Sequence, residues 1–488
     1  MRAPMLKLAL AAVLPLCVPH GGSARETTMA AVRYQLTYNA PGSAAAHVRM
    51  DIPGAAPAQR TLLIPRAVPM GYGDQPYDSF VANVVAFDAK GARLDVARAD
   101  GPRWRVGLAV RVEYDVDVAR MEREIQSGTD SSRVRLDYAF FLGYSVFGLI
   151  QGEEGRPIDL KIDAPKGWPV FSTLAPAAAS PGSLLRADNF YALADSQIAL
   201  GPALHVSAVH YQGEKQAPLW LAYYSEAPVD AARLEKLSGE AMTAISDYFD
   251  GSGPPPFPRF TVFLEFLKPV TPKHGYGFGM EHLETFHAAL AAADADPATL
   301  PDGRLRYHIA HHVAHAWIPK RCYGEGYYPF SWAASPKIDT IWFSEGFGQY
   351  AAIVALADLL ERTPEKQEEL RQQIVDRRFR SVLAEASPEL KRMPLRELSL
   401  LASKEYAVDF RIGQLTFARG GLMAAEMDDV IRSKTHGTKS LRDALRALIA
   451  WSAANKRAFR AEELPEIFRQ ATGVDVKPVM EKWLAPLD

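Results

Sequence analysis

Four of the twelve histidines of this 488-residue chain lie close together, at His308, His311, His312 and His315. Positions four apart on a helix lie one turn apart on one face. His311 and His315 can therefore hold one metal ion between them, and imidazole nitrogen is a common zinc ligand. His308 and His312 have the same spacing on an adjacent face of the helix, so these two histidines are an alternative pair of metal ligands.

A catalytic zinc site uses three protein ligands and leaves a fourth position open. Glu345 is the candidate for the third ligand, because it lies in an apolar stretch of helical periodicity downstream of His315. Ser344 is expected to cap the start of that helix, which would place the carboxylate in the first turn. The helix that carries the histidines should end near Pro319, because proline lacks the amide hydrogen.

The sequence around these residues resembles the glycyl aminopeptidase family of gluzincin zinc metallopeptidases. In that family HExxH is followed by Ala- or Thr-Trp, Lys-Arg, Pro-Phe and Trp-x-Ser-Glu-Gly-Phe. The matching residues here are His311, His315, Ala316, Trp317, Lys320, Arg321, Pro329, Phe330, Trp342, Ser344, Glu345, Gly346 and Phe347. The resemblance implies that His311, His315 and Glu345 bind one zinc ion.

The chain departs from the family at His312, where the family has the glutamate that activates the attacking water. An imidazole can accept a proton, but a nearby zinc ion disfavours the imidazolium. Loss of general-base assistance costs on the order of 10² to 10⁴ in rate. We therefore expect a weak or inactive aminopeptidase with His312 as the only local candidate base, or a pseudopeptidase that binds peptide termini. His312 could also close the open metal position, and a scaffold without zinc is a third possibility.

The stretch 274–284, HGYGFGMEHLE, carries alternating glycines that end at Gly279. Such glycines would let an edge strand lie close to a substrate backbone. The family has Gly-Gly-Leu-Glu-His here, and the chain has Phe278 in place of the first glycine. The resemblance implies that Glu281 binds the free amine of the substrate, with Gly279 and His282 beside it. Composition alone also allows a surface turn with a solvated glutamate.

A second catalytic element of the family is a tyrosine hydroxyl that stabilises the oxyanion of the tetrahedral intermediate. The corresponding positions here are Thr416 and Phe417. Phenylalanine has no hydroxyl, so this element is missing unless Tyr406 takes its place.

Several elements must hold these residues. Alternating apolar residues from about Val32 to Val209 predict short strands and an antiparallel β domain. A strand from Leu219, a helix from about Asp230 and a buried strand from Phe260 follow. We predict a multidomain α+β fold: an N-terminal β domain (25–212), a thermolysin-like catalytic domain (213–363) and a helical C-terminal part (364–488). The helical pattern of the last part includes a single helix over 365–385.

Residues 1–24 have the pattern of a secretory signal peptide: basic residues, a short apolar run and small residues at the end. We expect a periplasmic or secreted protein with no membrane span, because no apolar run is long enough. Cleavage would leave Cys322 as the only cysteine, so no intramolecular disulfide is expected. The net charge of −2 argues against nucleic acid as a partner.

The expected partner is a peptide or its N-terminus. The resemblance covers essentially the whole mature chain, and we expect no PDZ domain of the kind that many family members carry. The oligomeric state leaves no trace in the sequence.

Overall fold

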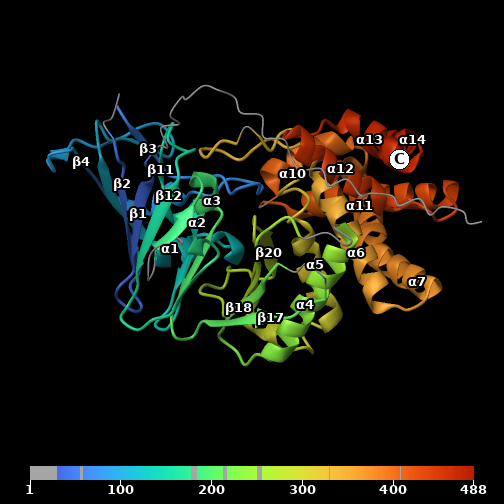
Figure 1. The fold of residues 1–488 in the computed structure, drawn as a ribbon, viewed down its shortest axis with the longest axis horizontal. Helices are drawn as coiled ribbons and strands as arrows, with labels where there is room; N and C mark the ends of the chain where they lie inside the picture. Colours follow the sequence, from blue (N-terminus) through green and yellow to red (C-terminus); the bar gives the residue numbers. More distant parts are fainter. Residues whose placement is uncertain are drawn as a thin grey trace, which may run out of the picture.

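The computed structural model describes residues 30–54, 59–176, 184–212, 217–249, 255–328, 330–406 and 408–487. The predicted signal peptide, 1–24, and Pro329 of the family pattern lie outside these residues. The described chain forms an N-terminal β part and a C-terminal part that contains a second sheet and most of the helices (Figure 1). The multidomain α+β fold predicted from the sequence is confirmed.

The N-terminal part is built on an eight-stranded sheet in the order β14-β15-β12-β1-β2-β8-β4-β5. Its central strands β1 (Val32–Thr37), β2 (Ala45–Asp51) and β8 (Arg111–Asp117) alternate buried apolar and more exposed polar residues, as period-two patterns require. Two four-stranded sheets, β13-β16-β10-β9 and β11-β3-β7-β6, pack with it around one core.

The other strands of this part are β3 (Thr61–Leu63), β4 (Val81–Phe87), β5 (Arg93–Leu94), β6 (Ala97–Arg98), β7 (Arg103–Arg105), β9 (Arg133–Val134), β10 (Ala139–Leu142), β11 (Leu149–Ile150), β12 (Ile158–Asp163), β13 (Val170–Ser172), β14 (Ala175–Pro176), β15 (Leu184–Ala187) and β16 (Gln197–Leu200). Among the described strands of this part the pairing is antiparallel, apart from β1 and β12, which run parallel. The pattern of alternation predicted the strands but not this pair, because a period of two is the same in both directions.

The C-terminal part contains a five-stranded sheet in the order β17-β18-β19-β21-β20. Its strands are β17 (His205–Val209), β18 (Leu219–Ser225), β19 (Phe260–Leu267), β20 (Phe278–Glu281) and β21 (Thr285–Ala291). The three parallel strands β18, β19 and β21 form the middle, and β19 is buried along its whole length. β20 is therefore an edge strand, and it carries Gly279 and Glu281.

Helices make up most of the rest of the C-terminal part. They are α4 (Ala231–Phe249), α5 (Asp302–Ala314), α6 (Ile341–Leu360), α7 (Pro364–Val375), α8 (Ser381–Glu385), α9 (Pro388–Lys391), α10 (Leu395–Glu405), α11 (Phe410–Lys434), α12 (Leu441–Asn455), α13 (Leu464–Thr472) and α14 (Lys477–Leu484). Shorter helices are α1 (Val118–Glu124), α2 (Gly143–Val146), α3 (Phe190–Ala194), η1 (Tyr77–Phe80), η2 (Gly128–Asp130), η3 (Ala292–Ala295), η4 (Asp376–Arg380) and η5 (Ala461–Glu463).

The predicted helix over 365–385 is confirmed, because the chain is helical without interruption from Pro364 to Glu385, but it contains a π-helical turn that was not predicted. The chain forms α7, then the π-helical turn η4, and then α8. A π-helical turn widens the helix by one residue and changes the direction of the side chains that follow. Phe379 of η4 is buried against Gly421 of α11, and the neighbouring arginines stay exposed.

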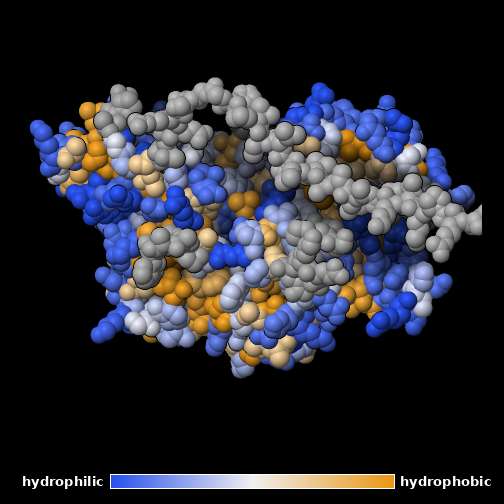
Figure 2. Space-filling view, viewed as in Figure 1, coloured by the Kyte–Doolittle hydropathy of each residue, from blue (hydrophilic) through white to orange (hydrophobic). Residues whose placement is uncertain are grey.

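The surface in the view of Figure 2 is mainly polar over the helical end of the molecule, with apolar patches nearer its middle. Among the described residues, none of the helices combines the length and the apolar character that crossing a bilayer requires. Cys322 is free and buried, and burial raises the pKa of its thiol to about 12.

Candidate metal centre and substrate pocket

Two buried helices bring three metal-binding side chains together. His311 lies in the last turn of α5, His315 is the residue that ends this helix, and Glu345 lies in α6. The two Nε2 atoms of His311 and His315 are 2.8 Å apart. The Glu345 Oε2 atom lies 3.3 Å from His311 Nε2 and 3.5 Å from His315 Nε2.

These three donor atoms form a triangle that fits a zinc ion. Zinc binds nitrogen and oxygen at about 2.0–2.2 Å, so two ligand atoms of a tetrahedral site lie about 3.3 Å apart. The His315 Nδ1 atom lies 2.7 Å from the carbonyl oxygen of Ile318 and donates to it. Because Nδ1 keeps its proton in this bond, loss of the Nε2 proton would leave a lone pair on Nε2 that points at the centre of the triangle.

The charges around the triangle favour a cation. Burial lowers the pKa of His315, but the carboxylates of Glu281 and Glu345 outweigh burial and raise it to about 9. Burial lowers the pKa of His311 to about 3, helped by the positive charge of His315. Two carboxylates thus share one imidazolium, and a divalent cation would supply the remaining positive charge.

The start of α6 differs from the sequence prediction. The helix begins at Ile341 after Thr340, so Ser344 lies inside the helix and is not its N-cap. Ile341, Trp342 and Phe343 are buried in the core, and their burial extends the helix toward its N-terminus. The Ser344 hydroxyl instead shares a 2.7 Å hydrogen bond with Tyr327.

Tyr72 reaches the site from the N-terminal part of the chain, and sequence reasoning missed it. Its hydroxyl donates to Glu345 Oε1 at 3.0 Å and lies 3.3 Å from the hydroxyl of Tyr327. This contact orients the carboxylate, since one oxygen accepts from Tyr72 while the other faces the histidines. No local pattern marks Tyr72 as a site residue, because the contact joins positions 273 residues apart.

His312 points toward Glu281. Its Nδ1 atom lies 3.5 Å from Glu281 Oε2, at the long end of an ion-pair contact. The ring stacks on Phe286 with centroids 4.6 Å apart and meets His308 edge-on at 4.9 Å. Burial lowers the pKa of His312 although Glu281 opposes this. His312 also lies close enough to His311 and His315 for the three imidazoles to form a possible metal cluster.

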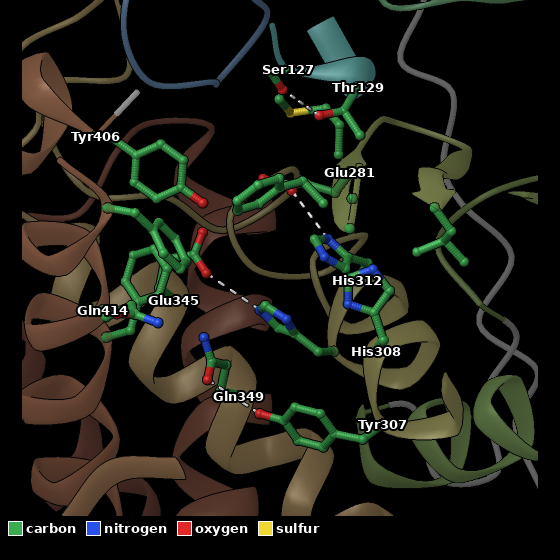
Figure 3. A pocket seen from close by; sticks show the side chains of 18 of the residues that line it. Ser127, Thr129, Glu281, Tyr307, His308, His312, Glu345, Gln349, Tyr406 and Gln414 are labelled. Carbon is green, nitrogen blue, oxygen red and sulfur yellow. Dashed lines mark hydrogen bonds and ion pairs between the residues drawn. The ribbon is translucent and has the colours of Figure 1, made fainter. Parts of the chain in front are cut away.

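A cavity of about 880 Å³ opens beside these residues (Figure 3). It is bounded by α5 and α6, by the edge strand β20, by η2 and by the helices α10 and α11. Residues that line it include Gly71, Tyr72, Ser127, Thr129, Asp130, Phe278, Gly279, Met280, Glu281, Arg304, Tyr307, His308, His311, His312, Glu345, Gln349, Arg377, Arg378, Tyr406, Phe410, Gln414 and Phe417. The candidate metal ligands His311 and Glu345 are thus accessible from a space large enough for a short peptide.

Gly279 and Glu281 line this cavity from β20. A Cβ atom at Gly279 would lie 2.4 Å from the Phe286 ring and 2.8 Å from His312 Nε2. The glycine is therefore required where the strand meets α5. Burial raises the pKa of Glu281, but the charge of His315 and the contact with His312 outweigh it and lower the pKa to about 2. Glu281 is an anion in this arrangement.

His282 lies on the other side of β20, outside the group of residues that line the cavity. Its Nδ1 atom is 3.0 Å from Asp195 Oδ1, and its ring stacks on Tyr144. Lys320 Nζ lies 3.7 Å from the same Asp195 oxygen. This placement lets His282 support the position of Glu281 from behind.

Tyr406 lines the cavity opposite Glu281, at the end of α10. Figure 3 shows its hydroxyl on the side of Glu345. Its ring meets Tyr72 edge-on at 5.6 Å and Phe410 at 5.2 Å. Burial raises its pKa, and the negative charges of Glu345 and Glu281 raise it further. Thr416, one of the two residues at the positions where the resemblance would put tyrosine, donates its hydroxyl hydrogen to the Ile412 carbonyl inside α11.

The fold is that of two-part metallopeptidase structures. Over 94% of this chain and 76% of the other, it is similar to an aminopeptidase N family protein from Idiomarina loihiensis, with a TM-score of 0.80 and 18% identity. An M1 zinc metallopeptidase from Deinococcus radiodurans aligns over 93% of each chain, with a TM-score of 0.53 and 15% identity. Native yeast LTA4 hydrolase aligns over 94% of this chain and 68% of its own, with a TM-score of 0.53 and 12% identity.

The N-terminal part has a match at the level of sequence. Residues 33–202 match the family model of the peptidase M61 N-terminal domain. This range begins within β1 and ends between β16 and β17. A comparison with curated protein sequences finds no match.

Proposed function

We propose that this protein binds one zinc ion through His311, His315 and Glu345 and takes the amino-terminal end of a peptide, as an aminopeptidase of low activity. The observation that carries the proposal is the triangle of donor atoms, whose edges of 2.8, 3.3 and 3.5 Å suit one tetrahedral ion. The Deinococcus metallopeptidase with a similar fold has also been solved as a mutant bound to a Tyr-Ser-Ala substrate.

The remaining side chains can be assigned roles in the cavity. Glu281 would pair with the free amine of the peptide, and the edge of β20 would align the peptide backbone. The Tyr406 hydroxyl can donate to the oxyanion that forms at the scissile carbonyl. When bound, zinc would polarise this carbonyl and lower the pKa of water. The uncharged Tyr406 keeps its proton for this donation, because burial and nearby carboxylates raise its pKa.

His312 decides between hydrolysis and binding. A general base must accept a proton from the attacking water, and the His312 ring is the side chain at the motif position that can do this. Burial lowers its pKa, so the imidazole is a weaker base than free histidine. We therefore propose slow hydrolysis, and the alternative is a pseudopeptidase that holds peptide termini without cleaving them. The contact of His312 with Glu281 favours this alternative, since it engages the ring with the amine-binding carboxylate.

Metal analysis and peptide turnover together test the proposal. Purified protein dialysed against zinc should retain about one ion per chain, and His315→Ala should lose it. His282→Ala is a matched control, because this histidine is also buried but follows the edge strand β20 and lies outside the metal triangle. Retention of stoichiometric zinc by His315→Ala would refute the metal site, and so would a wild-type protein without zinc.

The same preparations separate hydrolysis from binding. His312→Glu restores the residue of the family motif, and turnover of aminoacyl anilides should rise by roughly 10² or more if the rest of the site is competent. If the wild type is inactive and His312→Glu brings no gain while zinc is bound, the binding function is favoured. If the wild type is active and His312→Ala abolishes this activity, His312 is a working base.

A further inference from the structure

The cavity next to the candidate metal centre has charges of opposite sign at its two ends. Figure 3 shows Glu281, Ser127 and Thr129 at one end. Asp130, which follows Thr129 in η2, also lines the cavity. Arg304, Arg377 and Arg378 also line the cavity. Arg378 lies over the ring of Tyr307, and Figure 3 shows Tyr307 on the side of the cavity away from Ser127 and Thr129. A cavity with an anionic and a cationic end suits a ligand that is itself a zwitterion.

The three arginines come from two elements that meet at this end. Arg304 lies in the first turn of α5, and Arg377 and Arg378 lie in η4. Arg378 sits over the Tyr307 ring, with 4.6 Å from its guanidinium carbon to the ring centroid. The positive charges of Arg378 and Arg304 both act on His308 and help burial to lower its pKa. Helix α5 and the turn η4 therefore both place positive charge near His308.

The described residues supply no ion-pair partner for any of these three guanidinium groups. Their neighbours differ: Arg306 pairs with Glu240 at 2.6 Å, and Arg380 pairs with Asp376 within η4. Asp294 is the acidic residue at this end of the cavity, and its carboxylate accepts from the backbone of Ala291. Three cationic groups thus face the cavity with one carboxylate nearby.

The distance between the ends can be measured along α5. Arg304 precedes His311 by seven residues, which correspond to about 10 Å along the helix axis. An extended peptide advances about 3.3–3.6 Å per residue. A peptide whose scissile carbonyl lies at the metal centre would therefore reach the arginines with its second or third residue beyond that bond. The long arginine side chains shorten the remaining gap.

We propose that Arg304, Arg377 and Arg378 form a carboxylate-binding subsite, so that the cavity recognises short unblocked peptides of about three to four residues by both ends. This inference rests on the proposed function, because Glu281 and the metal centre fix the position of the amino-terminal residue. The carboxylate is the peptide's C-terminus or an acidic side chain at the same position. Guanidinium groups bind a C-terminal carboxylate and a side-chain carboxylate in the same bidentate geometry.

Calorimetric titration of the full-length protein tests the subsite with tetra-alanine and its C-terminal amide, on zinc-loaded and on metal-free protein. The free acid should bind roughly ten-fold more tightly than the amide, since the charge-assisted hydrogen bonds are lost in the amide. Arg304→Gln, Arg377→Gln and Arg378→Gln should each weaken binding of the acid several-fold and leave the amide unchanged. Arg378→Lys, which keeps the charge without the planar fork, should fall between wild type and Arg378→Gln.

Arg380→Gln is the matched control, because Arg380 lies in the same turn, is exposed, and has its own partner in Asp376. Equal binding of acid and amide by the wild type overturns the proposal, and so does absence of binding by both. Persistence of the preference in a triple glutamine variant also overturns it. Ala-Ala-Glu-amide separates the sources: affinity close to that of the free acid shows that side-chain carboxylates bind, and affinity close to that of the amide restricts the site to C-termini.

The measurement that tests the arginine subsite differs from those that test the proposed function. Zinc content and anilide turnover report on the metal centre, whereas the ratio of acid to amide affinity reports on the arginines. If the protein binds stoichiometric zinc and hydrolyses anilides but binds the free acid and the amide equally, the arginine subsite is refuted and the proposed function is not. If the protein binds no zinc but still binds the free acid more tightly than the amide, the arginine subsite is supported and the zinc metallopeptidase proposal is refuted.

Discussion

Asp130 illustrates how burial changes a single side chain in this cavity. Its carboxyl group lies in η2 at the anionic end, where burial raises its pKa to about 6 although Ser127 and Gln75 oppose the shift. Gln75 Nε2 donates to it at 3.0 Å. The folded protein therefore keeps this acid protonated up to about pH 6, whereas the unfolded chain ionises it near pH 4.

A raised folded-state pKa stabilises the protein below the unfolded pKa, and this stability is lost as the pH rises through the folded value. We expect Asp130 to cost about 1–2 kcal/mol of stability between pH 4 and pH 7, a value reduced for its partial exposure to solvent. Asp130→Asn cannot ionise, so its melting temperature should rise relative to wild type as the pH increases. Thermal unfolding of both proteins from pH 4 to pH 7.5 measures the difference.

Asp78 supplies a control of opposite sign. Burial would raise its pKa, but the ion pairs with Arg66 and Arg98 outweigh burial and lower it. Asp78→Asn should therefore lose most stability relative to wild type at neutral pH and least at acid pH. A melting-temperature difference between wild type and Asp130→Asn that does not change with pH would contradict the assignment of a raised pKa to Asp130.

At the scale of residues, local motifs marked the side chains that the structure brings together. His311 and His315 are one helical turn apart, and Glu345 follows in a distinctive apolar stretch, so the sequence predicted their convergence. The zinc-binding role of the three remains a prediction. Tyr72 and the arginine end of the cavity were missed because their contacts depend on segments far apart in the chain, which periodicity cannot bring together.

At the scale of elements, the position of Glu345 depends on how closely α6 packs against α11. Gly346 in α6 and Gly420 in α11 lie at this crossing, where a Cβ atom on Gly420 would be 1.9 Å from the Trp342 carbonyl oxygen. A Cβ atom on Gly346 would be 2.4 Å from the backbone of Gly420. Both contacts are with backbone, so a side chain could be accommodated only if the helices moved apart.

Gly420→Ala should destabilise the protein by about 2–3 kcal/mol, as overpacked sites do. It should also weaken zinc binding at least ten-fold, because a displaced α6 moves the Glu345 carboxylate away from the two histidines. Competition with a chromogenic chelator measures the affinity, and thermal unfolding measures the stability. Gly303→Ala is the control, since a Cβ atom there meets nothing within 4 Å and a helical alanine costs less than glycine. Unchanged zinc affinity in Gly420→Ala would show that α6 does not depend on this crossing.

The same elements show what periodicity can predict. Apolar residues at spacings of three and four predicted α4, and a continuous apolar run predicted β19, because burial on one face or on both leaves these patterns. The start of α6 and the π-helical turn η4 were not predicted. Both depend on which side chains the rest of the protein buries, and tertiary packing overrides local capping signals there.

At the scale of the whole molecule, the metal centre depends on both parts of the chain. The loop that carries Tyr72 belongs to the N-terminal part, and it also accepts a 2.9 Å hydrogen bond at the Pro69 carbonyl from Lys320 Nζ. Residues 127, 129 and 130 of the same part line the cavity next to Glu281. The N-terminal β part is therefore expected to complete the site as well as to support it.

Tyr72→Phe tests this dependence with the loss of one hydroxyl. The Glu345 carboxylate would lose the 3.0 Å hydrogen bond that orients it, and zinc affinity should fall roughly ten-fold, since partners of metal ligands typically contribute 10- to 100-fold. Tyr34→Phe is the matched control, because the Tyr34 hydroxyl donates to the Gly148 carbonyl at 2.9 Å inside the N-terminal core. That variant should lose about 1 kcal/mol of stability and keep its zinc affinity. Equal zinc affinities of the two variants would mean that the C-terminal part holds the metal site without help from the N-terminal part, because Tyr72 is the residue of that part that donates to the Glu345 carboxylate in the described chain.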